Sequence, residues 1–102
     1  MKCSKCGKEL GGPRDGSRIA FICGGVMGDE YIESYYRCGD CGAYTLEVYH
    51  DRFCGEGSVS VRGPLERKKA EKKMEIIGRC PKPWSKRCRC EAHIEYFGNI
   101  LD

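Results

Sequence analysis

The chain has 102 residues, enough for one domain, and its 40% hydrophobic content makes a core of this size only marginally stable unaided. Nine cysteines in so short a chain indicate that metal ions or disulfides add the missing stability. The formal charge of +3 is small, and metal-bound thiolates would lower it further, so the global charge gives no argument for a nucleic-acid partner.

The cysteine spacing favours metal binding over a disulfide framework. The first residues, M-K-C-S-K-C, contain no apolar targeting segment, and no apolar run is long enough to span a membrane. We therefore expect a cytoplasmic protein, in a reducing compartment where clustered Cys-x-x-Cys pairs are usually metal ligands. The odd cysteine count agrees, because two four-cysteine sites leave one thiol over. Two divalent ions bound by eight thiolates would change the formal charge from +3 to −1.

Two matching cysteine pairs form the first predicted site. They read C-S-K-C-G and C-G-D-C-G, and they supply the four thiolates of a tetrahedral structural metal: Cys3, Cys6, Cys38 and Cys41. Gly7, after the first pair, allows the backbone to fold back toward the sulfurs. A closed four-thiolate shell leaves no coordination position for water or substrate, so we expect no catalysis at this metal.

The sequence predicts two strands between the cysteine pairs, and a third strand and a short fourth one after the second pair. Residues 18–23 are β-branched and aromatic, and residues 31–37 run back from a glycine-rich turn at Gly24-Gly25 and Gly28-Asp29. Residues 44–49 alternate between two faces, which predicts a half-buried third strand. Val59 and Val61 indicate the short fourth strand.

A single helix is expected after the strands. Proline is favoured at the first helical position, so Pro64 predicts the start, and Gly78 followed by Pro81 predicts an end near Ile77. Residues 79–102 show no clear period and are expected to form an irregular tail.

The expected fold class is a small metal-stapled α+β protein. It has a three- to four-stranded antiparallel sheet, one helix and a Cys-rich irregular tail. We expect a metal-bound hairpin at residues 1–57 and, packed on it, a unit at residues 58–102 with the short strand, the helix and a second metal-binding segment.

The order of cysteine pair, hairpin, cysteine pair and strand resembles the zinc-ribbon fold group. The resemblance covers about the first 55 residues and rests on the four cysteines, on Gly7 and Gly42, and on the predicted strands. It implies a non-catalytic zinc-binding element that binds nucleic acid or protein. Rubredoxin holds a redox iron with similar pairs, but its second pair usually reads Cys-Pro-x-Cys, whereas Gly39 follows Cys38 here. A rubredoxin-like electron carrier is therefore the least favoured alternative.

Five further candidate ligands predict a second centre, and so two zinc ions in total. The preferred shell is Cys54, Cys80, Cys88 and Cys90, which would staple the tail to the end of the third strand. In the alternative shell, His93 replaces Cys54, and a third possibility leaves free buried thiols without a metal. The cationic residues around Cys88 and Cys90 favour a metal, because they lower thiol pKa values.

Two further candidate residues stand outside both sites. Cys23 lies in an apolar strand and is expected to be a small core residue rather than a ligand or reactive thiol. His50 continues the inward face of the third strand, and we expect a hydrogen-bonded structural histidine there rather than a ligand.

Charge is distributed unevenly along the chain. Residues 62–89 contain eleven Lys or Arg and three Glu, a local charge of +8, and the remaining residues sum to −5. This predicts a phosphate-binding face, on which Trp84 could stack an unpaired base. The alternative is a solvated helix face with Trp84 filling a small second core. The candidate nucleic-acid contacts are Lys68, Lys69, Lys72, Lys73, Arg87 and Arg89.

The leading functional hypothesis is a non-catalytic zinc-binding module that binds nucleic acid through the 62–89 face. The alternative is a protein–protein adaptor that uses the aromatic residues of the hairpin: Tyr31, Tyr35, Tyr36 and Tyr49. An enzyme is disfavoured, because the chain has only two histidines and no recognisable carboxylate pair or nucleophile–base set. No small-molecule substrate and no membrane partner is evident.

Overall fold

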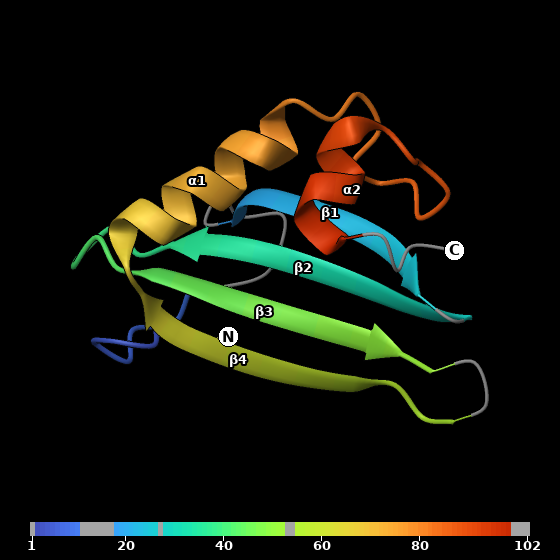
Figure 1. Cartoon of the computed structure of the whole chain (residues 1–102). Coiled ribbons are helices and arrows are strands. Elements are labelled where there is room, and N and C mark those ends of the chain that lie inside the picture. Colours follow the sequence, from blue (N-terminus) through green and yellow to red (C-terminus); the bar gives the residue numbers. More distant parts are fainter. Residues whose placement is uncertain (1, 11–17, 27, 53–54, 99–102) are drawn as a thin grey trace.

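The computed structural model describes residues 2–10, 18–26, 28–52 and 55–98. In this part of the chain, four antiparallel strands form one sheet in the order β1-β2-β3-β4, and two helices lie on one of its faces (Figure 1). The elements are β1 (Arg18–Val26), β2 (Asp29–Arg37), β3 (Tyr44–Asp51), β4 (Ser58–Leu65), α1 (Arg67–Gly78) and α2 (Glu91–Phe97). Neither of these helices has the length and apolar character needed to cross a membrane.

All four strands that the sequence predicts are present, and the first hairpin is longer than expected. Gly24 pairs with Tyr31 and Gly25 pairs with Glu30, so both glycines belong to β1 rather than to the turn. The hairpin turns at Gly28, whose φ of +86° is a conformation that glycine adopts easily. The fourth strand is also longer than expected: it has eight residues, and six of them pair with residues of β3.

The first helix begins three residues later than predicted. Pro64 is not its first residue but belongs to β4, where the next residue, Leu65, pairs with Tyr44 of β3. Proline is tolerated in β4 because an edge strand can leave one side of its backbone unpaired. The helix therefore starts at Arg67, and its end at Gly78 agrees with the predicted stop signal.

The tail contains a second helix that the sequence pattern did not reveal. α2 has seven residues, too few for a helical period to be recognised. Its N-cap is Cys90, whose Sγ accepts a hydrogen bond from the amide of His93, instead of one of the usual oxygen-bearing cap residues. The prediction of an irregular tail is therefore wrong for residues 91–97.

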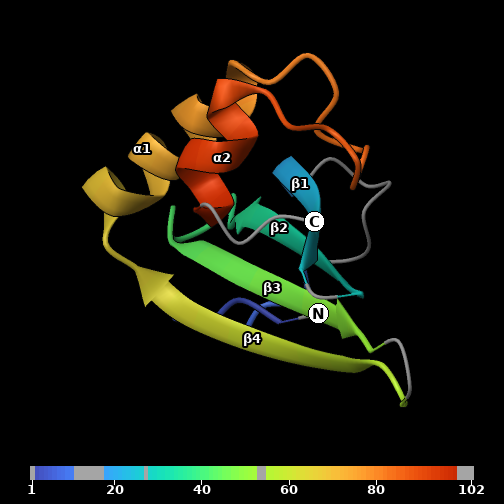
Figure 2. The same cartoon turned by 45° about the vertical axis from the view of Figure 1, so that its right-hand side comes forward.

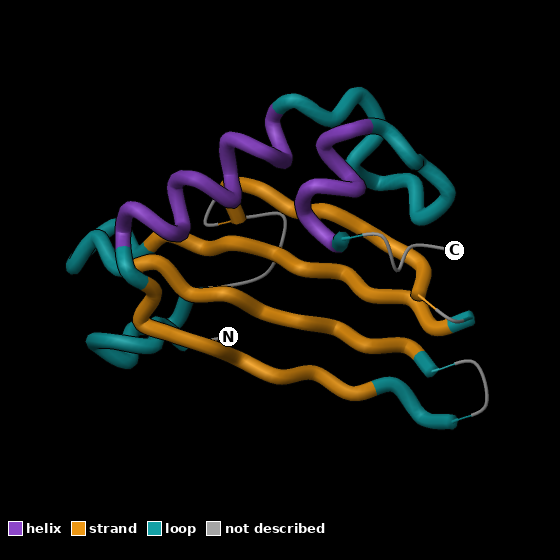
Figure 3. Tube along the Cα trace, viewed as in Figure 1, coloured by secondary structure: helices purple, strands orange, loops and turns teal. Residues whose placement is uncertain are grey.

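The main core lies between the helices and the sheet. α1 and α2 pack over β1, β2 and β3, while β4 lies beyond the cover of the helices (Figure 2). A loop at residues 79–90 joins the two helices (Figure 3). The buried residues of this core are Ile22, Tyr35, Leu46, Val48, Ile76, Ile77, Cys80, Ala92 and Tyr96.

Two of the four tyrosines proposed for an adaptor surface are core residues. Tyr35 is 2% exposed and packs under the helices, and Tyr36 is 1% exposed on the opposite face of the sheet, in a small cluster with Leu10. Neither ring can contact a partner, so an adaptor that uses all four tyrosines is wrong. Tyr31 and Tyr49 remain partly exposed.

Candidate metal centres and basic surface

The four cysteines of the first predicted site lie together where β2 leads into β3. Their four Sγ atoms all lie within 4.8 Å of one another. The Sγ atoms of Cys3 and Cys41 are 3.5 Å apart, and those of Cys6 and Cys38 are 3.6 Å apart. A tetrahedral ion with metal–sulfur bonds of about 2.3 Å separates its sulfurs by about 3.8 Å. The four thiols therefore fit one tetrahedral metal ion, which is compatible with a zinc ribbon.

The two Cys-x-x-Cys turns share one backbone geometry. In the first, the amide of Gly7 donates to the carbonyl of Cys3 at 3.1 Å, and in the second the amide of Gly42 donates to the carbonyl of Cys38 at 2.9 Å. Both glycines have positive φ, +77° and +74°, which other residues rarely adopt. The glycine after each pair is thus required by the turn.

Backbone amides in these turns favour the thiolate form. The amides of Cys6 and Lys5 lie 3.5 and 3.4 Å from Sγ of Cys3 and lower the pKa of Cys3 to about 6. The amides at the same two positions of the second turn lower the pKa of Cys38. Because a metal binds the thiolate and not the thiol, the turns prepare both sulfurs as ligands.

Thr45 of β3 and Gly63 of β4 contact the first Cys-x-x-Cys turn and hold it against the sheet. The amide and the hydroxyl of Ser4 lie 3.1 and 2.8 Å from Oγ1 of Thr45, which is fully buried. A Cβ atom at Gly63 would lie 2.5 Å from Oγ of Ser4, so β4 passes the turn only because this residue has no side chain. The first site is therefore tied to both β3 and β4.

The structure brings Cys80, Cys88, Cys90 and His93 together as a second group of possible ligands. All four ligand atoms lie within 4.8 Å of one another, with Cys80 Sγ 3.8 Å from Cys88 Sγ, 3.5 Å from Cys90 Sγ and 2.9 Å from His93 Nδ1. This is the shell in which the histidine supplies the fourth ligand. Cys54, the fourth ligand of the shell preferred from the sequence, lies outside the described residues.

A hydrogen bond to β1 sets the orientation of the histidine. Nε2 of the fully buried His93 lies 2.8 Å from the carbonyl oxygen of Cys23. Since a carbonyl only accepts, Nε2 carries the proton and Nδ1 presents its lone pair to the three thiols. Such an outer hydrogen bond is the usual support of a metal-binding histidine.

The thiols of the second group differ in their pKa values. Burial raises the pKa of Cys80 to about 12. Burial also opposes the thiolate of Cys90, but the backbone amide of His93 and the neighbouring thiols of Cys80 and Cys88 favour it, and the pKa of Cys90 is lowered to about 6. A metal bound here would displace the proton from Cys80, so binding at this site would release protons.

Cys23 and His50 lie outside both groups. Cys23 is 6% exposed in β1, burial raises the pKa of its thiol, and its amide donates to the carbonyl of Pro83 at 2.7 Å. Its backbone therefore ties the 79–90 loop to the sheet. His50 has its Nε2 2.8 Å from a carboxylate oxygen of Asp29 and stacks on Tyr31 with ring centroids 4.2 Å apart, the structural role expected for it.

Three of the six candidate nucleic-acid contacts share one hollow. It has a volume of about 360 Å³ beside α1 and is lined by Lys69, Lys72, Lys73, Ile76 and Glu95. Lys68 is also exposed on α1 but does not line this hollow.

The other two candidate contacts, Arg87 and Arg89, lie in the 79–90 loop, beyond the C-terminal end of α1. The structure therefore does not place all six residues around one hollow.

Carboxylates lower the local charge of residues 62–89. At least four of the basic side chains there form exposed ion pairs: Arg67 with Glu71, Lys69 with Glu66, Arg79 with Glu95, and Lys86 with Glu30. Exposed pairs add little to stability, but they reduce the field that a phosphate would meet.

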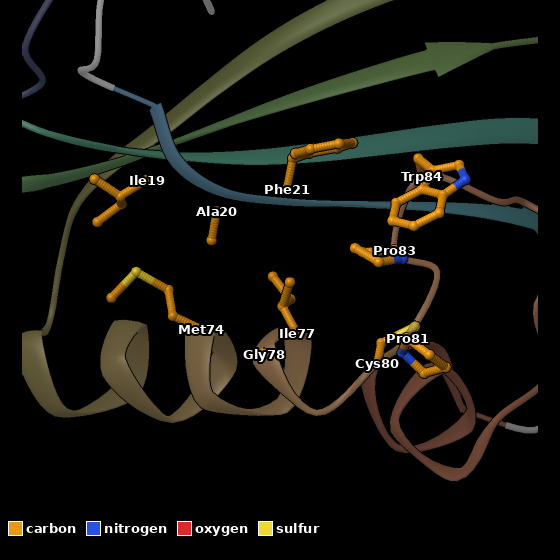
Figure 4. Close-up of a pocket in the computed structure, with 10 residues that line it drawn as sticks. All are labelled: Ile19, Ala20, Phe21, Met74, Ile77, Gly78, Cys80, Pro81, Pro83 and Trp84. Atoms are coloured by element: carbon orange, nitrogen blue, oxygen red, sulfur yellow. The ribbon is translucent and has the colours of Figure 1, made fainter.

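Trp84 does not fill a second core. Its side chain is 62% exposed and lines a groove of about 470 Å³ between β1 and α1, together with Ile19, Phe21 and Met74 (Figure 4). The alternative that buries Trp84 is therefore wrong, and the indole ring is available for contact with another molecule.

Comparison of the chain with models of known protein families, with curated proteins and with solved structures finds no match. The similarity to zinc ribbons therefore rests on the four-cysteine group and the strands around it.

Proposed function

We propose that the protein is a non-catalytic module, folded around two zinc ions, that binds nucleic acid through a basic surface on α1 and β4. Zinc is supported by the ligand sets, because four thiolates, or three thiolates and an imidazole, in a tetrahedral arrangement are its usual structural environment. A full shell of four protein ligands leaves no coordination position for a substrate, which supports a structural role for both ions.

The hollow beside α1 is the main support for nucleic-acid binding. Its three lysines are exposed to solvent, and among the described residues that line it Glu95 is the sole carboxylate. Glu95 already accepts a hydrogen bond from Arg79 at 2.5 Å, so its charge is largely balanced. Lys69 also lies 3.9 Å from a carboxylate oxygen of Glu66, but this exposed pair is weak and a phosphate can replace it. The three ammonium groups of the hollow therefore suit the phosphates of a nucleic-acid backbone.

Arg62 extends this basic surface onto the sheet. It lies opposite Leu46 in the β3–β4 ladder, and cross-strand partners project on the same face. Leu46 is buried beneath the helices, so Arg62 faces the helix side of the sheet as well. Arg62 is exposed, and β4 lies beyond the cover of the helices (Figure 2), so its charge faces solvent on the same side of the sheet as α1.

Titration of labelled single- and double-stranded oligonucleotides at several salt concentrations tests the proposal. Phosphate binding releases counterions, so affinity should fall steeply as salt rises. Replacing Lys69, Lys72 and Lys73 with Gln should weaken binding and lower the log–log salt slope by about 3, close to one for each lost phosphate contact.

A charge-matched control separates a specific surface from general attraction. Replacing Lys2, Lys5 and Arg37 with Gln removes the same charge near the first metal centre and should change the slope much less. Absence of binding at low salt, or equal effects of the two triple variants, would contradict the proposal.

A protein adaptor remains the second candidate, now through a different surface. Trp84 and Ile19, exposed by 62% and 46%, share the apolar groove between β1 and α1. Co-purification from the native host of a protein whose binding is lost in Trp84→Ala, together with no oligonucleotide binding, would favour this function over the first.

A further inference from the structure

Aromatic rings and one carboxylate surround a second hollow, at the C-terminal end of α2. Its volume is about 260 Å³, and none of its described lining residues belongs to either group of candidate metal ligands. Five side chains from β1, β2 and α2 line it: Val26, Tyr31, Glu33, Tyr96 and Phe97. Three of the five are aromatic, and one is acidic.

Separate contacts hold each aromatic ring in place. The ring of Phe97 lies against the backbone of β1, since a Cβ atom at Gly24 would come within 2.6 Å of it. Tyr96 meets Phe97 edge to face, with centroids 4.9 Å apart and an interplanar angle of 67°. Tyr31 stacks on His50. The walls of the hollow are therefore formed before any ligand arrives, which lowers the entropy cost of binding.

The carboxylate of Glu33 has a neutral partner. The hydroxyl of Tyr96 donates to Glu33, and this hydroxyl also lies 2.6 Å from the hydroxyl of Tyr35. Burial raises the pKa of both tyrosines, so they stay neutral hydrogen-bonding groups at neutral pH. In the part of the chain that the structure describes, no basic side chain forms an ion pair with Glu33. The hollow therefore contains a carboxylate that takes part in none of the ion pairs among the described residues.

We propose that this hollow binds a methylated ammonium group. Aromatic faces attract cations, and the carboxylate of Glu33 supplies the matching charge. An unmethylated ammonium has three N–H donors and is strongly hydrated, and one carboxylate cannot replace the water that it would lose. A methylated ammonium has fewer donors or none, and its methyl groups suit the rings and Val26.

A cation already lies against one of these rings. Nζ of Lys73 is 4.8 Å from the centroid of Tyr96, although Lys73 does not line the hollow. The site does not depend on nucleic-acid binding, because Tyr31, Glu33 and Phe97 are not part of the basic surface.

Ligand-observed NMR with the metal-loaded 102-residue chain tests the proposal. The probes are choline and a short peptide with one trimethyllysine. Ring currents in an aromatic hollow should shift the N-methyl proton signals of the probe upfield. The control is 3,3-dimethylbutan-1-ol, which has the shape of choline without the charge, and its methyl signals should not shift. Binding of either cationic probe supports the site, and the tighter one shows whether a small molecule or a lysine side chain carries the group.

Single substitutions connect the shifts to this hollow. Glu33→Gln keeps an acceptor for Tyr96 but removes the charge, and it should weaken binding about tenfold or more. Tyr31→Leu should weaken binding by a similar factor. Trp84→Leu, in the other groove, should leave binding unchanged, and amide spectra will confirm that each variant is folded. No shift with either cationic probe, an equal shift with the neutral alcohol, or unchanged binding in folded Glu33→Gln would overturn the proposal.

Discussion

His93 shows how one side chain can connect a metal site to the sheet. Its Nδ1 faces the thiols of Cys80, Cys88 and Cys90, and its Nε2 is hydrogen-bonded to the carbonyl of Cys23 in β1. The ring is fully buried, so the second hydrogen bond fixes both the tautomer and the orientation of the ligand. Loss of this side chain would therefore remove a ligand and a contact between α2 and β1 together.

Two buried tyrosines, Tyr35 and Tyr96, should ionise only above the pH at which a free tyrosine does. Burial raises the pKa values of Tyr35 and Tyr96, whose hydroxyls bond each other. Unfolded tyrosines ionise near pH 10, so the two groups do not penalise folding below about pH 10 and destabilise the fold progressively above it. We expect the free energy of unfolding to fall above this pH, and to fall less in Tyr96→Phe. Tyrosinate absorbance that shows all six residues ionising together, without unfolding, would contradict this.

At the scale of elements, α2 is a short helix held by its surroundings. Seven residues are too few for a stable isolated helix. Its first turn carries Cys90 and His93 of the second centre, and its last turn packs Phe97 on Gly24. Between them, Tyr96 bonds to β2 through Glu33. The position of α2 thus depends on the metal ligands and on a close approach to β1.

Gly24→Ala should displace α2 and destabilise the protein. The new Cβ would lie 2.6 Å from the ring of Phe97, so the ring or the strand must move, at a cost of about 1–3 kcal/mol. Gly78→Ala is the matched control, because a Cβ there meets nothing within 4 Å and alanine favours a helix by up to about 1 kcal/mol. Urea unfolding of the two variants measures both effects. Equal stability of Gly24→Ala and the wild type would show that Phe97 does not pack as described.

The sequence predicts some elements better than others for physical reasons. Alternation in residues 44–49 and the paired glycine turns are local signals, so the strands and the first site follow from them. The second shell depends on which thiols meet in space, which spacing along the chain does not reveal. The C-x2-H spacing of Cys90 and His93 is the one local feature that indicates His93 as a ligand, because residues three apart lie on the same side of a helical turn. The helix start predicted at Pro64 is wrong because proline is also tolerated in an edge strand, and Pro64 belongs to β4.

In the molecule as a whole, the two candidate metal centres connect different sets of segments. The first joins the N-terminal turn to the connection between β2 and β3. The second joins the end of α1, the 79–90 loop and α2 to β1. With this shell, the two divalent ions would change the formal charge from +3 to 0 rather than to −1, because only seven thiolates take part.

Removal of the metals should abolish cooperative unfolding. A structural zinc site contributes about 10–16 kcal/mol of binding free energy, whereas a whole domain is stable by only about 5–15 kcal/mol. A strong chelator is therefore expected to unfold the chain, as followed by circular dichroism, and added zinc should restore the fold. An unchanged thermal transition after both ions have been removed would contradict a structural role for the metals.

We propose that the protein binds two zinc ions, the second through Cys80, Cys88, Cys90 and His93. Native mass spectrometry of protein purified without added metal tests it most directly, because it counts the ions and identifies them by mass. We predict two zinc ions in the wild type, in Cys54→Ser and in Cys23→Ser, and one in His93→Ala. A single ion in the wild type, iron in place of zinc, or loss of an ion in Cys54→Ser with both retained in His93→Ala would contradict this account.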